Sequence, residues 1–486
     1  MRKIFVLITV LISLQIYSFA QSKAGDLKIE PFTFETPNNP KVEAERGFLT
    51  VPENRQKPNS RLIEIAFVRF KSISPKPKSP IVYLAGGPGG SGIGAASSAT
   101  RFPMFMALRE VADVIALDQR GVGQSKPNLN CISFIDLPLE KAVSENEYLQ
   151  MAQEKSKPCA KYWTDQGVDL TGYNTIENAD DIDDLRKALG APKINILGIS
   201  YGTHLGLTVL KRHGKNIEKT ILAGVEGLDH TYKLPSNIQL QLEAIARELK
   251  TDAELNAKIP DLLALMKRVF DRVEKNPETV EFTDSRTQQK VKVTIGKFDL
   301  QLLTAIGMGD TNFISNLPAL FYAMDNGNFS FIAPQVVALR KRGIGSAMAF
   351  MMDCASGISK KRFKQIEGEI SKTLLGALID FPFPKVCEAW NQKDLGDSFR
   401  APFKTKVPTL FISGTLDGRT PVSNAEETRQ GFSDSQHLII ERAGHSDDLF
   451  VSSPQIVETM IAFLKGQKIS TSKITLKPLK FAQVSE

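Results

Sequence analysis

The chain has 486 residues, of which 61 are Lys or Arg and 54 are Asp or Glu, so its formal net charge at pH 7 is +7. The basic residues are scattered rather than grouped in blocks, which indicates a solvated surface and argues against a nucleic-acid-binding face. The length is sufficient for one large domain with an insertion or for two domains.

Residues 1–20 predict a secretory signal peptide. Arg2 and Lys3 give it a positive start, residues 4–16 are apolar, and small residues precede a cleavage point after Ala20. An N-terminal membrane anchor is the alternative, but the apolar stretch is too short for a lasting span, and no later stretch is long enough. We therefore expect an exported protein, either periplasmic or extracellular.

The next part of the chain alternates between strand and helix patterns. Residues 21–44 are polar and predict a lead-in segment, and residues 45–230 predict the first part of a core. Within that core, "RGFLTVPE" and "RLIEIAFVRFKS" predict an antiparallel pair, whereas "IVYLAGG", "VADVIALDQRG", "KINILGIS" and "KTILAGVEG" predict strands separated by helices. The pattern predicts an α/β fold whose mostly parallel sheet is covered by helices on both faces.

The alternation stops near residue 231. Helical periodicity, a polar-tipped hairpin in "TVEFTDSRTQQKVKVTIG" and further helix predict a large, mainly helical lid over residues 231–395. The strand patterns "VPTLFISG" and "SQHLIIERAG" then predict the second part of the core, residues 396–468. Residues 469–486 form a polar, lysine-rich tail for which the sequence predicts no structure.

The glycine-rich stretch "GGPGGSG", residues 86–92, admits two interpretations. It formally fits the G-x-G-x-x-G loop that binds dinucleotides, and Asp118 ends the next strand at the spacing of a ribose-binding carboxylate. Nicotinamide cofactors are mainly intracellular, so the predicted export counts against this interpretation. The alternative is half of an oxyanion hole, where glycines let backbone N–H groups approach a reacting carbonyl closely.

A second motif favours the oxyanion hole. The sequence Gly198-Ile199-Ser200-Tyr201-Gly202 fits G-x-S-x-G between a predicted strand and a predicted helix, which is the setting of a nucleophile elbow. A serine that only occupies a tight turn is the alternative. We predict that Ser200 is a nucleophile and that the N–H groups of Tyr201 and Gly87 are the oxyanion-hole donors.

A serine nucleophile needs a base, and the base needs an orienting carboxylate. Of the five histidines, His445 follows the last core strand in a loop from which it can overhang the strand ends, and Asp417 follows the preceding strand. The chain order Ser200, Asp417, His445 is that of α/β-hydrolases. A surface turn for His445 and an Asx-type turn at Asp417 are the alternatives.

The chain has four cysteines, and an even number in an exported protein favours two disulfides. Sequence proximity favours the pairs Cys131–Cys159 and Cys354–Cys387. The C-x2-C and His-containing spacings of zinc sites are absent, so no metal is expected.

Four motifs together resemble the prolyl iminopeptidase and tripeptidyl aminopeptidase branch of the serine α/β-hydrolases: "GGPGGSG", "DQRGVGQS", "GISYGTHLG", and "SGTLDGRTP" with "GHS". The resemblance extends from about residue 45 to 468. It implies an α/β-hydrolase fold, a helical lid, acyl-enzyme hydrolysis at free peptide N-termini and a Cys354–Cys387 disulfide. Prolyl iminopeptidases usually have His where Ala85 stands, which favours the tripeptidyl aminopeptidase-like group.

An aminopeptidase must compensate the charge of a buried substrate ammonium with carboxylates. Glu226 follows a predicted strand, and Asp353 lies beside Cys354 in the lid, so either is a candidate to bind the amine. A solvated or structural role is the alternative for both. In "DQRGVGQS", we expect Asp118 and Arg120 to hold their loop together rather than to react.

The hypothesis we favour is an exported serine aminopeptidase that acts on small peptides with a free N-terminus and needs no cofactor. A carboxylesterase or another acyl hydrolase with the same triad is the second hypothesis. A catalytically silent binding protein is the third, and the intact triad argues against it. Neither the peptide length nor the oligomeric state follows from the sequence.

Overall fold

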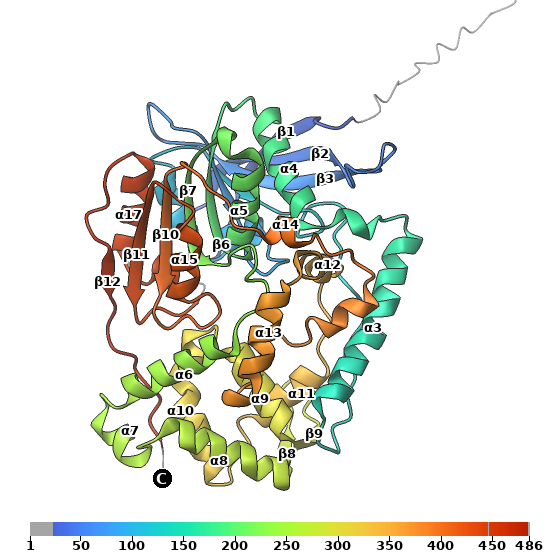
Figure 1. The fold of residues 1–486 in the computed structure, drawn as a ribbon, viewed down its shortest axis with the longest axis vertical. Helices are drawn as coiled ribbons and strands as arrows, with labels where there is room; N and C mark the ends of the chain where they lie inside the picture. The colour runs from blue at the N-terminus through green and yellow to red at the C-terminus, as the bar shows by residue number, and fades with distance from the viewer. Residues whose placement is uncertain (1–22, 446, 485–486) are drawn as a thin grey trace, which may run out of the picture.

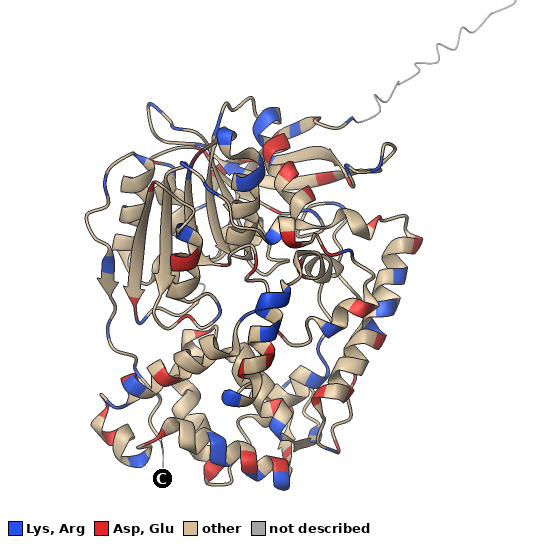
Figure 2. Ribbon diagram, viewed as in Figure 1, with Lys and Arg blue, Asp and Glu red and all other residues tan. Residues whose placement is uncertain are grey.

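The computed structural model describes residues 23–445 and 447–484. Figure 1 shows a sheet flanked by helices in one part of the molecule and a mainly helical lid in the other. The predicted signal peptide, residues 1–20, lies outside the described residues. None of the helices within the described ranges has the length and apolar character that a membrane crossing requires. Acidic and basic residues are interspersed along the ribbon of both parts (Figure 2).

Ten strands form the main sheet. They are β1 (Leu27–Phe34), β2 (Val42–Pro52), β3 (Leu62–Phe70), β4 (Ile81–Leu84), β5 (Val114–Leu117), β6 (Ile194–Ser200), β7 (Ile217–Val225), β10 (Thr409–Gly414), β11 (Ser435–Glu441) and β12 (Lys473–Thr475). Their spatial order is β1-β2-β3-β5-β4-β6-β7-β10-β11-β12. The strands from β5 to β12 in that order pair in parallel, and β1, β2 and β3 are antiparallel to their neighbours.

The central strands are apolar along their whole length because helices cover both faces of the sheet. One face packs on α1 (Gly92–Ala96), α2 (Phe102–Leu108), α16 (Asp448–Val451) and α17 (Pro454–Leu464). The other face packs on α4 (Thr175–Ala188), α5 (Tyr201–His213) and α15 (Val422–Arg429). The expected α/β architecture is therefore confirmed.

Both ends of the described chain join this architecture. The expected lead-in, residues 21–44, contains β1, which pairs with β2 from Leu27↔Leu49 to Phe34↔Val42. The tail, residues 469–486, contributes β12 beside β11, and its Phe481 and Val484 are buried. The chain then ends beside the lid (Figure 1). Because β1 and β12 are polar, half-exposed strands at the edges of the sheet, their sequences lack the pattern from which a strand is predicted.

The lid is built from helices and a two-stranded hairpin. Its main elements are α6 (Pro235–Leu249), α7 (Ala253–Lys258), α8 (Leu262–Lys275), β8 (Glu278–Thr283), β9 (Lys290–Ile295), α9 (Lys297–Gly307), α10 (Thr311–Asp325), α11 (Ala333–Arg340), α12 (Ala347–Ser356) and α13 (Lys360–Glu369). Shorter elements are η1 (Leu170–Gly172), η2 (Gly214–Asn216), η3 (Ile370–Lys372), η4 (Lys385–Ala389) and α14 (Asp397–Arg400), of which η3 and η4 lie in the lid segment.

A second segment also belongs to the lid. The chain after β5 leaves the core, pairs with the lid through the bridges Asn130↔Ser346 and Phe134↔Gly343, and continues into α3 (Glu145–Asp165). Figure 1 shows α3 running along the side of the lid. The sequence predicts this segment as part of the core, residues 45–230, because a pairing between residues some 200 positions apart leaves no local pattern.

A buried arginine ties the two lid segments together. The fully buried Arg340 forms a two-pronged ion pair with Asp299, at 2.6 and 2.9 Å. Its remaining N–H groups donate to the main-chain oxygens of Pro138, Lys141 and Thr294. One guanidinium thus joins α9, α11, β9 and the segment that precedes α3.

We expect Arg340→Ala to destabilise the lid by about 3–5 kcal/mol, because Asp299 would remain buried without its counter-charge. Thermal unfolding and limited proteolysis measure this loss. The control is Arg268→Ala, which removes an exposed ion pair with Asp325 and costs at most about 1 kcal/mol. Equal losses in the two variants would contradict the prediction.

Candidate active site

The predicted nucleophile elbow is a sharp turn between β6 and α5. Ser200 ends the strand with φ 54° and ψ −126°, a backbone conformation that side-chain-bearing residues rarely adopt. A Cβ at Gly198 would lie 2.5 Å from the oxygen of Gly202, and one at Gly202 would lie 2.0 Å from the oxygen of Leu84. Both flanking positions therefore require glycine.

The glycine-rich loop after β4 lies directly against this elbow. A Cβ at Gly86 would come within 2.9 Å of both the Ile199 oxygen and the Ser200 Cβ. Gly87 has φ +124°, and its N–H group has no hydrogen-bond acceptor within the described part of the chain. The loop therefore offers a main-chain donor near Ser200 that no acceptor of the described chain engages.

Asp417 and His445 meet at the carboxyl ends of their strands. Asp417 follows β10, His445 follows β11, and His445 Nδ1 lies 2.8 Å from Asp417 Oδ2. The other carboxylate oxygen accepts from the N–H groups of Arg419 and Thr420, so the Asx-type turn exists alongside the histidine contact. Burial by itself would raise the pKa of Asp417, but the histidine and the hydrogen bonds from Thr420 hold it below the usual carboxyl value.

The end of β7 lies between this pair and Ser200. Val225 pairs with Ser200, and a Cβ on its neighbour Gly224 would lie 3.4 Å from His445 Cε1. Within the described residues no hydrogen bond joins Ser200 to His445. Such contacts commonly tighten only when substrate binds. The fold thus brings Ser200, Asp417 and His445 to the carboxyl ends of β6, β10 and β11.

The dinucleotide interpretation is not compatible with the surroundings of Asp118. This residue is fully buried, and its carboxylate accepts from Ser91 and from the N–H groups of Ile93 and Gln124. Both carboxylate oxygens are engaged and buried, so neither is accessible to a ribose hydroxyl. Arg120 is also fully buried and binds Asp181, so both residues hold the structure together as expected.

The candidate amine-binding residues belong to a cluster of acids around one lysine, in which Glu226 is buried and the other members are half-buried. Lys233 Nζ lies 3.1 Å from Glu226 Oε2, and its main-chain N–H donates to Asp380 Oδ2 at 2.6 Å. The charges of Lys233, Glu226 and Asp380 all act on Asp353. Sequence reasoning missed Asp380 and Lys233; an aspartate in the apolar run "LLGALIDFPFP" was the available signal. One ammonium is therefore surrounded by three carboxyl groups, of which Glu226 forms the ion pair.

Burial dominates the titration of this cluster. It raises the pKa of Asp353 well above the usual carboxyl value and that of Asp380 to about 7, although the positive charge of Lys233 opposes both shifts. Burial lowers the pKa of Lys233 less than the three carboxylates raise it. The cluster is thus poised to accept a further positive charge.

One cavity, of about 400 Å³, connects the oxyanion loop with the acid cluster. Gly87 and Asp353 both line it, together with Pro88, Phe350 and the segment 381–383. Residues of the described chain form no group of three His, Cys, Asp or Glu that could hold a metal ion. A molecule in this cavity would therefore meet a carboxyl group at one side and the oxyanion loop at another.

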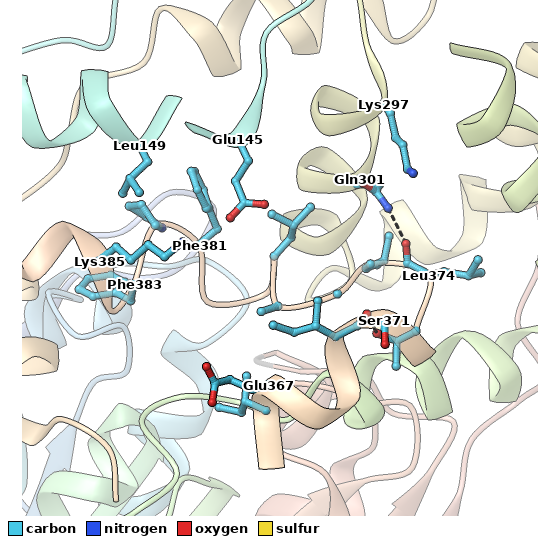
Figure 3. A pocket seen from close by; sticks show the side chains of 18 of the residues that line it. Glu145, Leu149, Lys297, Gln301, Glu367, Ser371, Leu374, Phe381, Phe383 and Lys385 are labelled. Atoms are coloured by element: carbon cyan, nitrogen blue, oxygen red, sulfur yellow. Dashed lines mark hydrogen bonds between the residues drawn. The ribbon is translucent and has the colours of Figure 1, made fainter. Parts of the chain in front are cut away.

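A larger cavity of about 630 Å³ lies within the lid, between α3, α8, α9 and α13 (Figure 3). In it, Gln301 donates to the oxygen of Leu374 at 2.6 Å. The segment 381–383 lines both cavities. Unlike the first cavity, this second cavity is lined by neither Gly87 nor Asp353.

Both predicted disulfides are present, as Cys131–Cys159 and Cys354–Cys387. The second joins α12, which carries Asp353, to η4, and so holds the acid against the segment 381–383. Since disulfides persist in oxidising compartments, their presence is compatible with the expected export.

Two family models match the chain. One, described as "alpha/beta hydrolase fold", covers residues 79–270, and the other, described as "TAP-like protein", covers residues 382–473. Together with the sheet order and the nucleophile elbow, these matches show that the chain has the α/β-hydrolase fold. Within that class, the second match confirms the resemblance to the tripeptidyl aminopeptidase-like branch that the motifs predict.

Relatives in sequence carry peptidase and hydrolase names. "Tripeptidyl aminopeptidase" of Streptomyces lividans is 32% identical over 168 residues, which are 33% of this chain and 31% of the relative. "Serine protease Hip1" of Mycobacterium bovis is 31% identical over 197 residues, 38% of each chain. "Putative hydrolase YuaR" of Escherichia coli is 29% identical over 440 residues, 82% of this chain and 81% of the relative. The match thus spans only about a third of the two peptidases.

Solved structures give weaker likenesses. Proline iminopeptidase of Mycobacterium smegmatis has a TM-score of 0.40 and 15% identity, covering 86% of this chain and 98% of that one. An esterase from Exiguobacterium antarcticum has a TM-score of 0.36 and 16% identity, with the same coverage. At these scores the likenesses add nothing to the fold assignment.

We expect Asp380→Asn to become more stable relative to the wild type as the pH rises from 4 to 8. The unfolded carboxyl loses its proton near pH 4, whereas the folded carboxyl keeps it until about pH 7, so the wild type loses stability across this window. The asparagine does not titrate, and the gain at pH 8 is on the order of a few kcal/mol. Melting temperatures at the two pH values measure it; a difference between the proteins that is independent of pH would contradict it.

Proposed function

We propose that the protein is an exported serine aminopeptidase that releases residues or short peptides from free peptide N-termini. The observation that carries this proposal is the cavity that Gly87 of the glycine-rich loop and Asp353 of the acid cluster both line. The names of the relatives and the TAP-like match support the peptidase chemistry. The two disulfides support export through the predicted signal peptide.

In this mechanism Ser200 Oγ attacks the scissile carbonyl. Because His445 Nδ1 is engaged with the ionised Asp417, its Nε2 is free to take the serine proton and to pass it to the leaving amine. The N–H groups of Gly87 and Tyr201 stabilise the oxyanion. Water then hydrolyses the acyl-enzyme, with His445 again acting as base.

The carboxyl cluster distinguishes an aminopeptidase from a general acyl hydrolase. An ester or an acetylated peptide brings no positive charge, so neither would compensate the charge of three carboxyl groups gathered around one lysine. A peptide ammonium would balance part of this excess. We assign Asp353 to direct contact with the ammonium because it lines the cavity, and Glu226 and Asp380 to support through Lys233.

The first experiment compares matched fluorogenic substrates, prolyl and alanyl, with one residue or three, each with a free or acetylated N-terminus. We expect cleavage of the free-amine peptides alone, and loss of at least about 10⁴-fold in kcat for Ser200→Ala. The preferred length then defines the branch. Indifference to acetylation, or turnover of simple esters only, would replace the proposal with a general acyl hydrolase.

Asp353→Asn is expected to lower kcat/KM for free-amine peptides about 10- to 100-fold, because it removes the partner of a charged group. Hydrolysis of a simple ester should stay within about twofold of the wild type. Glu281→Gln, on the exposed hairpin, is the control and should change neither rate. Equal losses on peptide and ester would show that Asp353 supports the fold rather than the amine.

A further inference from the structure

The oxyanion loop, residues 85–90 after β4, is rich in glycine and therefore has a main chain that can change conformation. Glycine lets the backbone reach Ser200, but it also leaves the peptide planes of residues 85–90 free to rotate. A plane that turns over would direct a carbonyl oxygen, rather than an N–H group, at the reacting carbon. Preorganised donors contribute to catalysis only if their direction is held before substrate arrives. Some contact must therefore fix these planes.

Two hydrogen bonds do so at the start of the loop. Gln119 Nε2 donates to the main-chain oxygen of Ala85 at 2.9 Å, which fixes the plane between Ala85 and Gly86. Gly90 N–H donates to the oxygen of Gly86 at 3.0 Å, which fixes the next plane. Since the Gly86–Gly87 peptide is trans, the N–H of Gly87 points away from that oxygen.

The glutamine is itself held from behind. Its Oε1 accepts from Asn178 Nδ2 at 2.8 Å, and both side chains are fully buried. Asn178 lies on α4, one of the helices that cover the sheet. With one end bonded to a donor and the other to an acceptor, the amide has a single favourable orientation.

The neighbouring residue holds the other end of the loop. Asp118 accepts from Ser91 and from the N–H of Ile93, where the loop enters α1. The consecutive residues Asp118 and Gln119 thus anchor the two ends of "AGGPGGSG" to the end of β5. The motif "DQRGVGQS", which follows the neighbouring strand β5, thus holds the oxyanion loop in place by hydrogen bonds.

We propose that Gln119 is a positioning residue: it locks the Ala85–Gly86 peptide plane, on whose orientation the following plane with the Gly87 N–H depends, and so helps the Gly90–Gly86 hydrogen bond to aim that N–H at the oxyanion. This role rests on the proposed function, because it assumes that the loop stabilises an oxyanion. Gln119 touches no reacting atom and acts through the main chain. Leucine at this position would keep the shape but would lose both hydrogen bonds.

Kinetics and inhibitor affinity test the lock. Ser200 Oγ adds to the carbonyl carbon of a peptide aldehyde. The aldehyde oxygen then lies in the oxyanion hole, and the serine proton moves to His445. The corresponding alcohol forms no such adduct. For Gln119→Leu we expect kcat and aldehyde affinity to fall together, by about 100- to 1,000-fold, with KM and alcohol affinity within about threefold of the wild type. Gln119→Asn, which keeps the amide on a side chain one carbon shorter, should fall between.

The control is Gln301→Leu, which removes a comparable bond to a main-chain oxygen within the lid and should leave all four quantities unchanged. Wild-type kcat in Gln119→Leu, or a parallel loss of aldehyde and alcohol affinity, would overturn the proposal. A crystal structure of Gln119→Leu gives a readout that needs no substrate. The Ala85 oxygen should turn from its native direction, and an unchanged plane would overturn the lock even if the wild type proved to cleave neither peptides nor esters.

Discussion

The closest approach of three main-chain segments around Ser200 is the constraint on which the rest of the structure depends. The strained elbow, the end of β4 and the start of α5 meet at distances that exclude a Cβ at Gly86, Gly198 and Gly202. Such strain persists only where the surroundings determine the conformation completely. The continuous apolar strands and the helices on both faces provide those surroundings, and they expose the serine hydroxyl at the sheet edge.

The same need for support explains the buried polar groups outside the reacting centre. Gln119 and Asp118 hold the glycine-rich loop, and Arg340 holds the two lid segments together. In each case a side chain with several hydrogen bonds replaces contacts that a flexible backbone cannot make for itself. Their burial leaves little freedom for alternatives, because a partly satisfied buried network is costly.

Two aspartates, the buried Asp417 and the half-buried Asp353, show how neighbours decide the protonation of the same side chain. Asp417 faces a histidine and several N–H and O–H donors, and its pKa lies below the usual value. Asp353 faces one shared lysine and two further acids, and its pKa lies far above it. The first is suited to orient a base as an anion. The second holds a proton that a substrate ammonium could displace.

The sequence by itself determined the local features: the alternation of strands and helices, the elbow at Ser200, the chain order of Asp417 and His445, and two disulfides between cysteines that are near in sequence. Short-range patterns within one element or one turn carry the first two features, and motif order or proximity in sequence carries the others. Only the tertiary structure decided which distant segments meet. It joined the segment before α3 to the lid, brought Asp380 to the acid cluster and placed Gln119 beneath the oxyanion loop. Such contacts depend on the path of the whole chain, which no local pattern encodes.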